Sequence, residues 1–146
     1  MFPVLFVRGF IGTSVRRRIV KPAYNGAGRR RMSSQRELLS RIYAAFNRRE
    51  IETVLSALHP DVDWPNGMEG GRVLGHDAVR AYWTRQFQIL DPHVEPKAFT
   101  AENDVIVVDV EQVVHEKSGK LLVNQMIQHV YQFRDGLVCR MDIRAV

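Results

Sequence analysis

The sequence contains a single cysteine, Cys139, among 146 residues. One thiol can form no internal disulfide and cannot build a zinc site made of cysteines. No apolar run approaches the roughly 20 residues that cross a bilayer. The apolar stretch at residues 2–7 is also too short for the core of a secretory signal, and no basic residue precedes it. We therefore expect a cytoplasmic protein that has no membrane partner.

Acidic residues are absent from the first 31 positions, which hold eight arginines and lysines. Residues 32–146 hold 13 basic and 16 acidic residues, so their net charge is −3, although the whole chain carries +5. The basic charge thus belongs to one segment, and aromatic residues do not alternate with its arginines. We do not expect nucleic acid to be a partner.

Residues 1–31 show no sustained helical or strand periodicity. We expect them to be a basic, disordered tail, or translated sequence upstream of a natural start at Met32. A targeting segment and a basic arm with a partner of its own remain as alternatives. In each case the folded domain is predicted to be residues 32–146.

Three amphipathic helices are predicted in the first half of this domain. Ser34 and Glu37 fit a capping box that starts the first helix, which ends near Asn47. The second helix runs from about residue 50 and stops at the His59-Pro60 pair. The third covers about residues 76–90.

The periodicity then changes from that of a helix to the alternation of strands. Strands are predicted at residues 94–100, 105–116, 120–133 and 137–144, and Asp135-Gly136 marks a hairpin before the last of them. Helices followed by an antiparallel meander indicate an α+β fold.

The turn at residues 117–119 sets a pairing of the two long strands in which Glu116 lies opposite Leu121. It then pairs Val108 with His129, Val110 with Ile127, and Gln112 with Gln125. The same face carries Val114, Val123, Tyr131 and Phe133 and is the more apolar one. The opposite face mixes polar and apolar side chains, as a dimer contact does: Asp109, Glu111, Asn124, Met126, Gln128 and Gln132. A slip of one residue would exchange the two faces.

Three segments carry a resemblance to a known family: residues 58–64 (LHPDVDW), residues 75–83 (GHDAVRAYW) and residues 131–142 (YQFRDGLVCRMD). Their order and spacing resemble the SnoaL-like branch of the nuclear-transport-factor-2-like superfamily. The resemblance implies a cone-shaped roll of three N-terminal helices packed on a curved, mainly antiparallel sheet, with an apolar pocket between them. Members include ketosteroid isomerase, polyketide cyclases and limonene-epoxide hydrolase, while others only bind ligands or hold complexes together.

The catalytic residues of ketosteroid isomerase are not retained at the matching positions. The Asp-Pro-x-Gly element of its general base is replaced by Trp64-Pro65-Asn66-Gly67. Its oxyanion-binding Asp is replaced by His129, and its helical tyrosine matches a position next to Tyr43. Steroid isomerisation by the familiar mechanism is therefore not expected.

His129 is the leading catalytic candidate, because a neutral imidazole on an apolar wall can donate to a carbonyl oxygen or accept a proton. Its structural alternative is a hydrogen-bonded core histidine. Asp142 would lie opposite His129 and orient its ring if the turn at Asp135-Gly136 is regular, whereas a bulge would place Asp142 outside.

Aromatic side chains that line a ligand pocket, or simply fill the core, come from several elements: Tyr43, Phe46, Trp64, Tyr82, Trp83, Phe87, Tyr131 and Phe133. The predicted pocket consists of Tyr43, Trp64, Trp83, Phe87, Gln112, Gln125 and Tyr131. The two glutamines form either a polar pocket floor or a hydrogen-bonded pair.

The five histidines lack metal-ligand spacing and no phosphate loop is present, so we predict no metal and no cofactor. Three functions remain open. The first is acid/base catalysis (isomerase, cyclase or hydrolase type) on a small apolar carbonyl compound or epoxide. The second is non-catalytic binding of such a ligand. The third is an interaction module that forms a homodimer through its sheet face.

Overall fold

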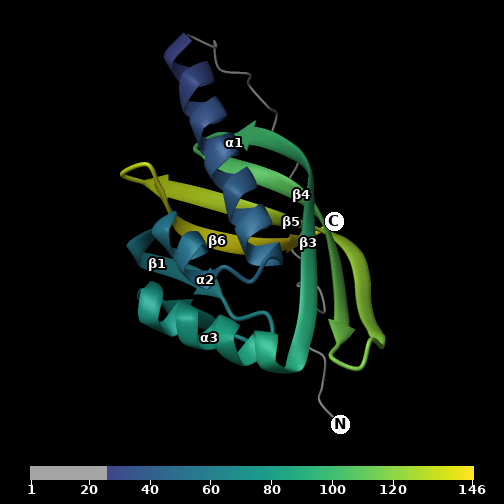
Figure 1. The fold of residues 1–146 in the computed structure, drawn as a ribbon. Coiled ribbons are helices and arrows are strands. Elements are labelled where there is room, and N and C mark those ends of the chain that lie inside the picture. Colours follow the sequence, from purple (N-terminus) through teal and green to yellow (C-terminus); the bar gives the residue numbers. More distant parts are fainter. Residues whose placement is uncertain (1–25) are drawn as a thin grey trace.

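The computed structural model describes residues 26–146, so the part of the predicted tail at residues 1–25 lies outside the described residues. Three helices pack against one six-stranded sheet (Figure 1). The helices are α1 (Gly26–Asn47), α2 (Ile51–Ser56) and α3 (Gly75–Ile89). The strands are β1 (Leu58–Pro65), β2 (Arg72–Leu74), β3 (Leu90–Glu102), β4 (Val105–Glu116), β5 (Leu121–Arg134) and β6 (Leu137–Ala145).

The strand order is β2-β1-β6-β5-β4-β3, and every neighbouring pair is antiparallel except β1 and β6. The sheet curls around the helices, with α1 against β3 and α3 against β1 (Figure 1). This is the predicted α+β cone, in which helices cover the concave face of a mainly antiparallel sheet. The core lies between the two layers and includes Leu39, Val54, Val79, Val108 and Val138.

The first helix begins earlier than its predicted N-cap. α1 starts at Gly26, eight residues before Ser34, so the capping-box prediction at Ser34 and Glu37 is wrong. Residues 26–31 are all exposed, and this end of α1 extends beyond the sheet (Figure 1). An exposed turn has no apolar stripe to mark it, while alanine and arginine have high helix propensity. The chain therefore continues a helix across the predicted boundary at Met32.

The predicted pairing of the two long strands is confirmed over most of its length. Val108 lies opposite His129 and Gln112 lies opposite Gln125, and the more apolar face points into the core. The pairing shifts beyond Val114, so that Leu121 lies opposite His115 instead of Glu116.

A register shift between Gln132 and Phe133 interrupts the pairing of β5 with β6. Beyond this shift His129 lies opposite Ile143, and Asp142 lies opposite Val130. Because successive side chains of a strand point to opposite faces, Asp142 and His129 lie on different faces of the sheet.

Within residues 26–146, no helix is both long enough and apolar enough to span a membrane.

Candidate functional site

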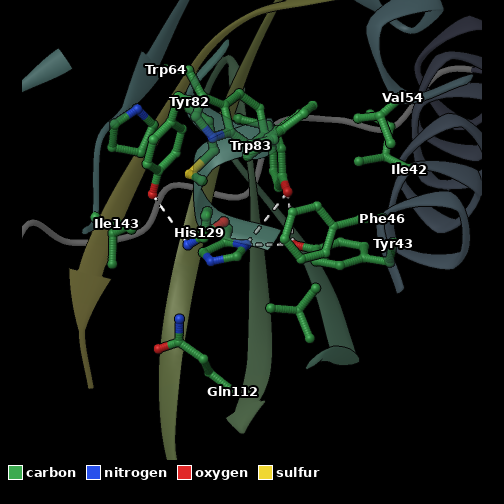
Figure 2. Close-up of a pocket in the computed structure, with 16 residues that line it drawn as sticks. Ile42, Tyr43, Phe46, Val54, Trp64, Tyr82, Trp83, Gln112, His129 and Ile143 are labelled. Carbon is green, nitrogen blue, oxygen red and sulfur yellow. Dashed lines mark hydrogen bonds between the residues drawn. The ribbon is translucent and has the colours of Figure 1, made fainter. Parts of the chain in front are cut away.

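A cavity lies between the helices and the concave face of the sheet (Figure 2). Its volume is about 70 Å³, well below the roughly 300–1,000 Å³ of pockets that hold drug-sized ligands, so only a small molecule fits it. Sixteen residues line it: Ile42, Tyr43, Phe46, Val54, Trp64, Pro65, Gly67, Tyr82, Trp83, Gln86, Val94, Gln112, His129, Tyr131, Met141 and Ile143.

Five of the seven residues predicted to form the pocket are among these sixteen: Tyr43, Trp64, Trp83, Gln112 and Tyr131. The catalytic candidate His129 lines the cavity as well. Phe87 does not line the cavity. Its ring packs against the ring of Phe46. The guanidinium of Arg49 lies over the Phe87 ring, with its Cζ atom 4.5 Å from the ring centre. Gln125 also lies outside the lining and reaches it only through a hydrogen bond to Gln112. That these side chains bind a ligand stays a prediction.

The lining contains no Asp, Glu, Lys or Arg. Its titratable groups are the imidazole of His129 and three tyrosine hydroxyls. Burial raises the pKa of Tyr43 and Tyr131, and it raises the pKa of Tyr82 to about 12. All three phenols are therefore neutral near pH 7, and the cavity carries no strong carboxylate base.

A chain of hydrogen bonds joins two of these tyrosines to His129 (Figure 2). Tyr131 Oη donates to Tyr43 Oη at 2.8 Å, and Tyr43 Oη lies 2.8 Å from Nδ1 of His129. Each hydroxyl carries one proton. With Tyr131 donating to Tyr43, the Tyr43 proton is free to point at Nδ1, and in this arrangement Nδ1 is the acceptor; Tyr131 Oη lies 3.5 Å from the same nitrogen.

Burial lowers the pKa of His129 from 6.5 to about 4, because desolvation disfavours the charged imidazolium. The ring is therefore neutral near pH 7 and carries one proton. With Nδ1 acting as acceptor, this proton resides on Nε2.

The Nε2 atom of His129 borders the cavity. Nε2 has no hydrogen-bond partner among the described residues. Every fully buried side-chain nitrogen or oxygen of residues 26–146 does have a partner, so Nε2 is not one of these atoms. The atom is thus not sealed in the core, although the residue as a whole is only 6% exposed and lines the cavity. The site therefore offers an N–H donor at the cavity wall.

A second polar group lies on the α3 side of the cavity. Gln86 Nε2 donates to Tyr82 Oη at 3.3 Å. The backbone N–H groups of Gly67 and Met68 form hydrogen bonds to the same oxygen, which partly offset the rise in the pKa of Tyr82. Sequence reasoning assigned no role to Gln86. The sequence feature that could have pointed to Gln86 is its position as a polar residue on the apolar face of a predicted helix.

Comparison with known proteins agrees with this geometry. The family described as the SnoaL-like domain matches residues 39–141, which is more than half of the chain. The chain belongs to the SnoaL-like family.

Solved structures similar to this SnoaL-like domain include TerC, crystallised with polyporic acid. TerC is 30% identical, with a TM-score of 0.68 and coverage of 77% of this chain and 92% of TerC. An NTF2-like protein of unknown function from Burkholderia pseudomallei is also 30% identical, with a TM-score of 0.69 over 79% of this chain and 92% of that protein. A proposed polyketide cyclase from Xanthomonas campestris shares the fold at 18% identity, with a TM-score of 0.70 over 80% and 93% of the two chains. A comparison with curated proteins found no match.

Asp142 does not take part in the cavity of this SnoaL-like domain, so its predicted pairing with His129 is wrong. Its carboxylate accepts hydrogen bonds from Arg140 and Arg72 on the outer face of the sheet. Asp63 bridges the same two arginines. The register shift between β5 and β6 causes this placement, and the four side chains form a charge-balanced structural network.

No cluster of three or more His, Cys, Asp or Glu side chains that could hold a metal ion occurs in the described part of the SnoaL-like chain.

Proposed function

We propose that this SnoaL-like domain binds a neutral, largely apolar molecule that carries a carbonyl oxygen, and that His129 donates a hydrogen bond to that oxygen. The observation that carries the proposal is the Tyr131–Tyr43–His129 chain, which directs the single imidazole proton to Nε2 at the cavity wall.

The lining supports a neutral ligand. A charged ligand would lose its hydration in a cavity whose walls hold no opposite charge, and this loss is costly. The indole rings of Trp64 and Trp83 pack edge to face 5.4 Å apart and offer apolar surface to a flat ligand. TerC was crystallised with polyporic acid, which supports a small organic ligand in this family.

A neutral imidazole donor favours reactions in which negative charge develops on a carbonyl oxygen. Enolisation and ring closure of carbonyl compounds belong to this class. Epoxide hydrolysis is supported less well, because no carboxylate lines the cavity to activate a water molecule.

Non-catalytic binding is the second candidate, and the pKa of His129 favours it. A pKa of about 4 makes this imidazole a weak proton acceptor near pH 7. The same donor then serves recognition alone.

Acetophenone and ethylbenzene form a pair of probes that differ in the carbonyl oxygen. We expect the wild-type protein to bind acetophenone roughly three- to tenfold more tightly, the equivalent of one hydrogen bond. Quenching of Trp64 and Trp83 fluorescence measures both dissociation constants. His129→Leu should remove the preference and leave ethylbenzene binding unchanged. Equal binding of the two probes to the wild type, or an undiminished preference in the variant, contradicts the proposal.

Deuterium exchange separates catalysis from binding. Exchange of the methyl hydrogens of acetophenone in D₂O, followed by mass spectrometry, reports enolisation. Exchange accelerated by the wild type and not by His129→Leu supports an enzyme, whereas binding without accelerated exchange supports the binding protein.

A further inference from the structure

The side chain of Gln112 is oriented by a partner that lies outside the cavity. Gln112 on β4 lies directly opposite Gln125 on β5, and Gln125 Nε2 donates to Gln112 Oε1 at 2.9 Å. A carboxamide has one acceptor end and one donor end. Once Gln125 occupies the acceptor end, the donor end of Gln112 points elsewhere.

The amide nitrogen of Gln112 faces the cavity. This nitrogen has no hydrogen-bond partner among the described residues. Every fully buried side-chain nitrogen or oxygen of residues 26–146 does have a partner. The nitrogen is therefore accessible, although Gln112 is only 8% exposed and lines the cavity. Figure 2 shows the side chains of Gln112 and His129 on neighbouring strands of the same wall.

We propose that Gln112 is a second hydrogen-bond donor to the ligand, and that the cavity selects an apolar molecule with two acceptor oxygens. One oxygen accepts from Nε2 of His129 and the other from Nε2 of Gln112. Gln125 is a positioning residue that keeps the donor end of Gln112 turned inward. This inference rests on the proposed function of the cavity as a ligand site.

The sheet sets the spacing of the two residues that carry the donors. Gln112 lies level with Gln125, and His129 is four residues further along β5 on the same face. At about 3.3 Å per residue, the two positions are roughly 13 Å apart along the sheet. Because the donors come from residues spaced this far apart on the sheet, the proposed ligand carries its two acceptors in separate groups. A benzene ring bearing two acyl groups has this form.

Diacetylbenzenes and their mono-ketone analogues test the second donor. The pairs are 1,4-diacetylbenzene with 4-ethylacetophenone, and 1,3-diacetylbenzene with 3-ethylacetophenone. The members of each pair have closely similar shapes and differ in one carbonyl oxygen. We expect the wild-type protein to bind the diketone of at least one pair about tenfold more tightly, as measured by calorimetry. Gln112→Leu should remove this preference, so that the diketone and the mono-ketone of each pair bind equally tightly.

A substitution at Gln125 tests the positioning role. In Gln125→Glu, a carboxylate accepts from the amide nitrogen of Gln112, so Oε1 of Gln112 turns to the cavity. We expect the preference for the diketone to disappear and to be replaced by a preference for the hydroxyl analogue 4-(1-hydroxyethyl)acetophenone. Gln132→Glu, the same change at an exposed position of β5, is the matched control and should bind like the wild type.

The outcomes distinguish this inference from the proposed function. If neither diketone binds more tightly than its mono-ketone, or if Gln112→Leu keeps the preference, the second donor is wrong while the carbonyl site at His129 stands. If Gln125→Glu keeps the wild-type preference, Gln125 does not position the amide. If the mono-ketones bind no better than 1,4-diethylbenzene, the proposed function itself fails.

Discussion

Tyr43 and His129 lie 86 residues apart in the chain, and their side chains meet at 2.8 Å between Oη and Nδ1. Their rings are also nearly parallel, with an angle of 8° between the planes and 5.9 Å between the centres. Tyr43 belongs to α1 and His129 to β5, so the packing of the first helix on the sheet fixes the orientation of the imidazole. The fold and the donor at the cavity wall therefore depend on the same contact.

The depressed pKa of His129 predicts a pH-dependent stability. The unfolded state, with a pKa of 6.5, binds more protons than the folded state, whose pKa is about 4. Stability is thus fully present above pH 6.5 and falls as the pH drops towards 4. The contribution is at most about 3 kcal/mol from a difference of this size.

Urea unfolding at several pH values, with His129→Gln as the reference, isolates this contribution from that of the carboxylates. We expect the wild type to lose stability relative to the variant between pH 6.5 and 4. Parallel pH profiles would show that the folded protein tolerates a charged imidazole.

Asp142→Asn should separate stability from ligand binding. Burial alone would raise the pKa of Asp142, but hydrogen bonds from Arg140 and the charge of Arg72 outweigh this effect and lower the pKa. The contribution of this carboxylate to folding stability is therefore present above its ordinary pKa of 3.8 and is lost in acid. Because the carboxylate is partly exposed, we expect a loss of about 1 kcal/mol or less in thermal or urea unfolding at pH 7. The affinity for acetophenone should not change. A large loss of affinity would mean that Asp142 acts on the cavity after all.

Gly67 provides a test of the cavity wall. A Cβ at this position would lie 3.8 Å from Tyr82 Oη and 3.9 Å from Ile143 Cδ1, which is ordinary contact. We expect Gly67→Ala to fold with an unchanged melting temperature. Gly67→Leu should fill part of the cavity and weaken acetophenone binding about tenfold or more. Unchanged binding by the leucine variant would place the ligand elsewhere.

We also propose that the outer face of β4 and β5 forms a homodimer contact. Met126 is 43% exposed there, beside Gln128, which donates to Asp109 at 2.7 Å. Gln128→Glu would set a second carboxylate against Asp109 and should weaken the dimer. Sedimentation at micromolar concentration should show a dimer for the wild type and more monomer for the variant. A monomeric wild type at high concentration rules this contact out.

Alternation along the two long strands was enough to predict the cavity-facing wall. His129, Gln112 and Tyr131 follow the two-residue period, and their predicted register is observed although the pairing next to the turn is shifted. The shift between Gln132 and Phe133 was not predictable from alternation, because one extra residue leaves the pattern on each side intact. That shift moved Asp142 to the outer face.

The hydrogen-bond partners of the site residues also could not be predicted from the sequence. Tyr43 was expected as a pocket residue, but its bond to His129 depends on how α1 crosses the sheet. The same holds for β2, a three-residue strand in a glycine-rich link whose sequence gives no strand signal. Long-range packing decides both features.

Nitrogen-15 NMR of histidine-labelled protein at pH 7 tests the central claim most directly, because it reports which ring nitrogen of His129 carries the proton. We predict a neutral ring with the proton on Nε2, which loses this strict preference in Tyr43→Phe. A charged imidazolium at pH 7, or a proton on Nδ1 in the wild type, would contradict the assignment of His129 as a donor to the cavity.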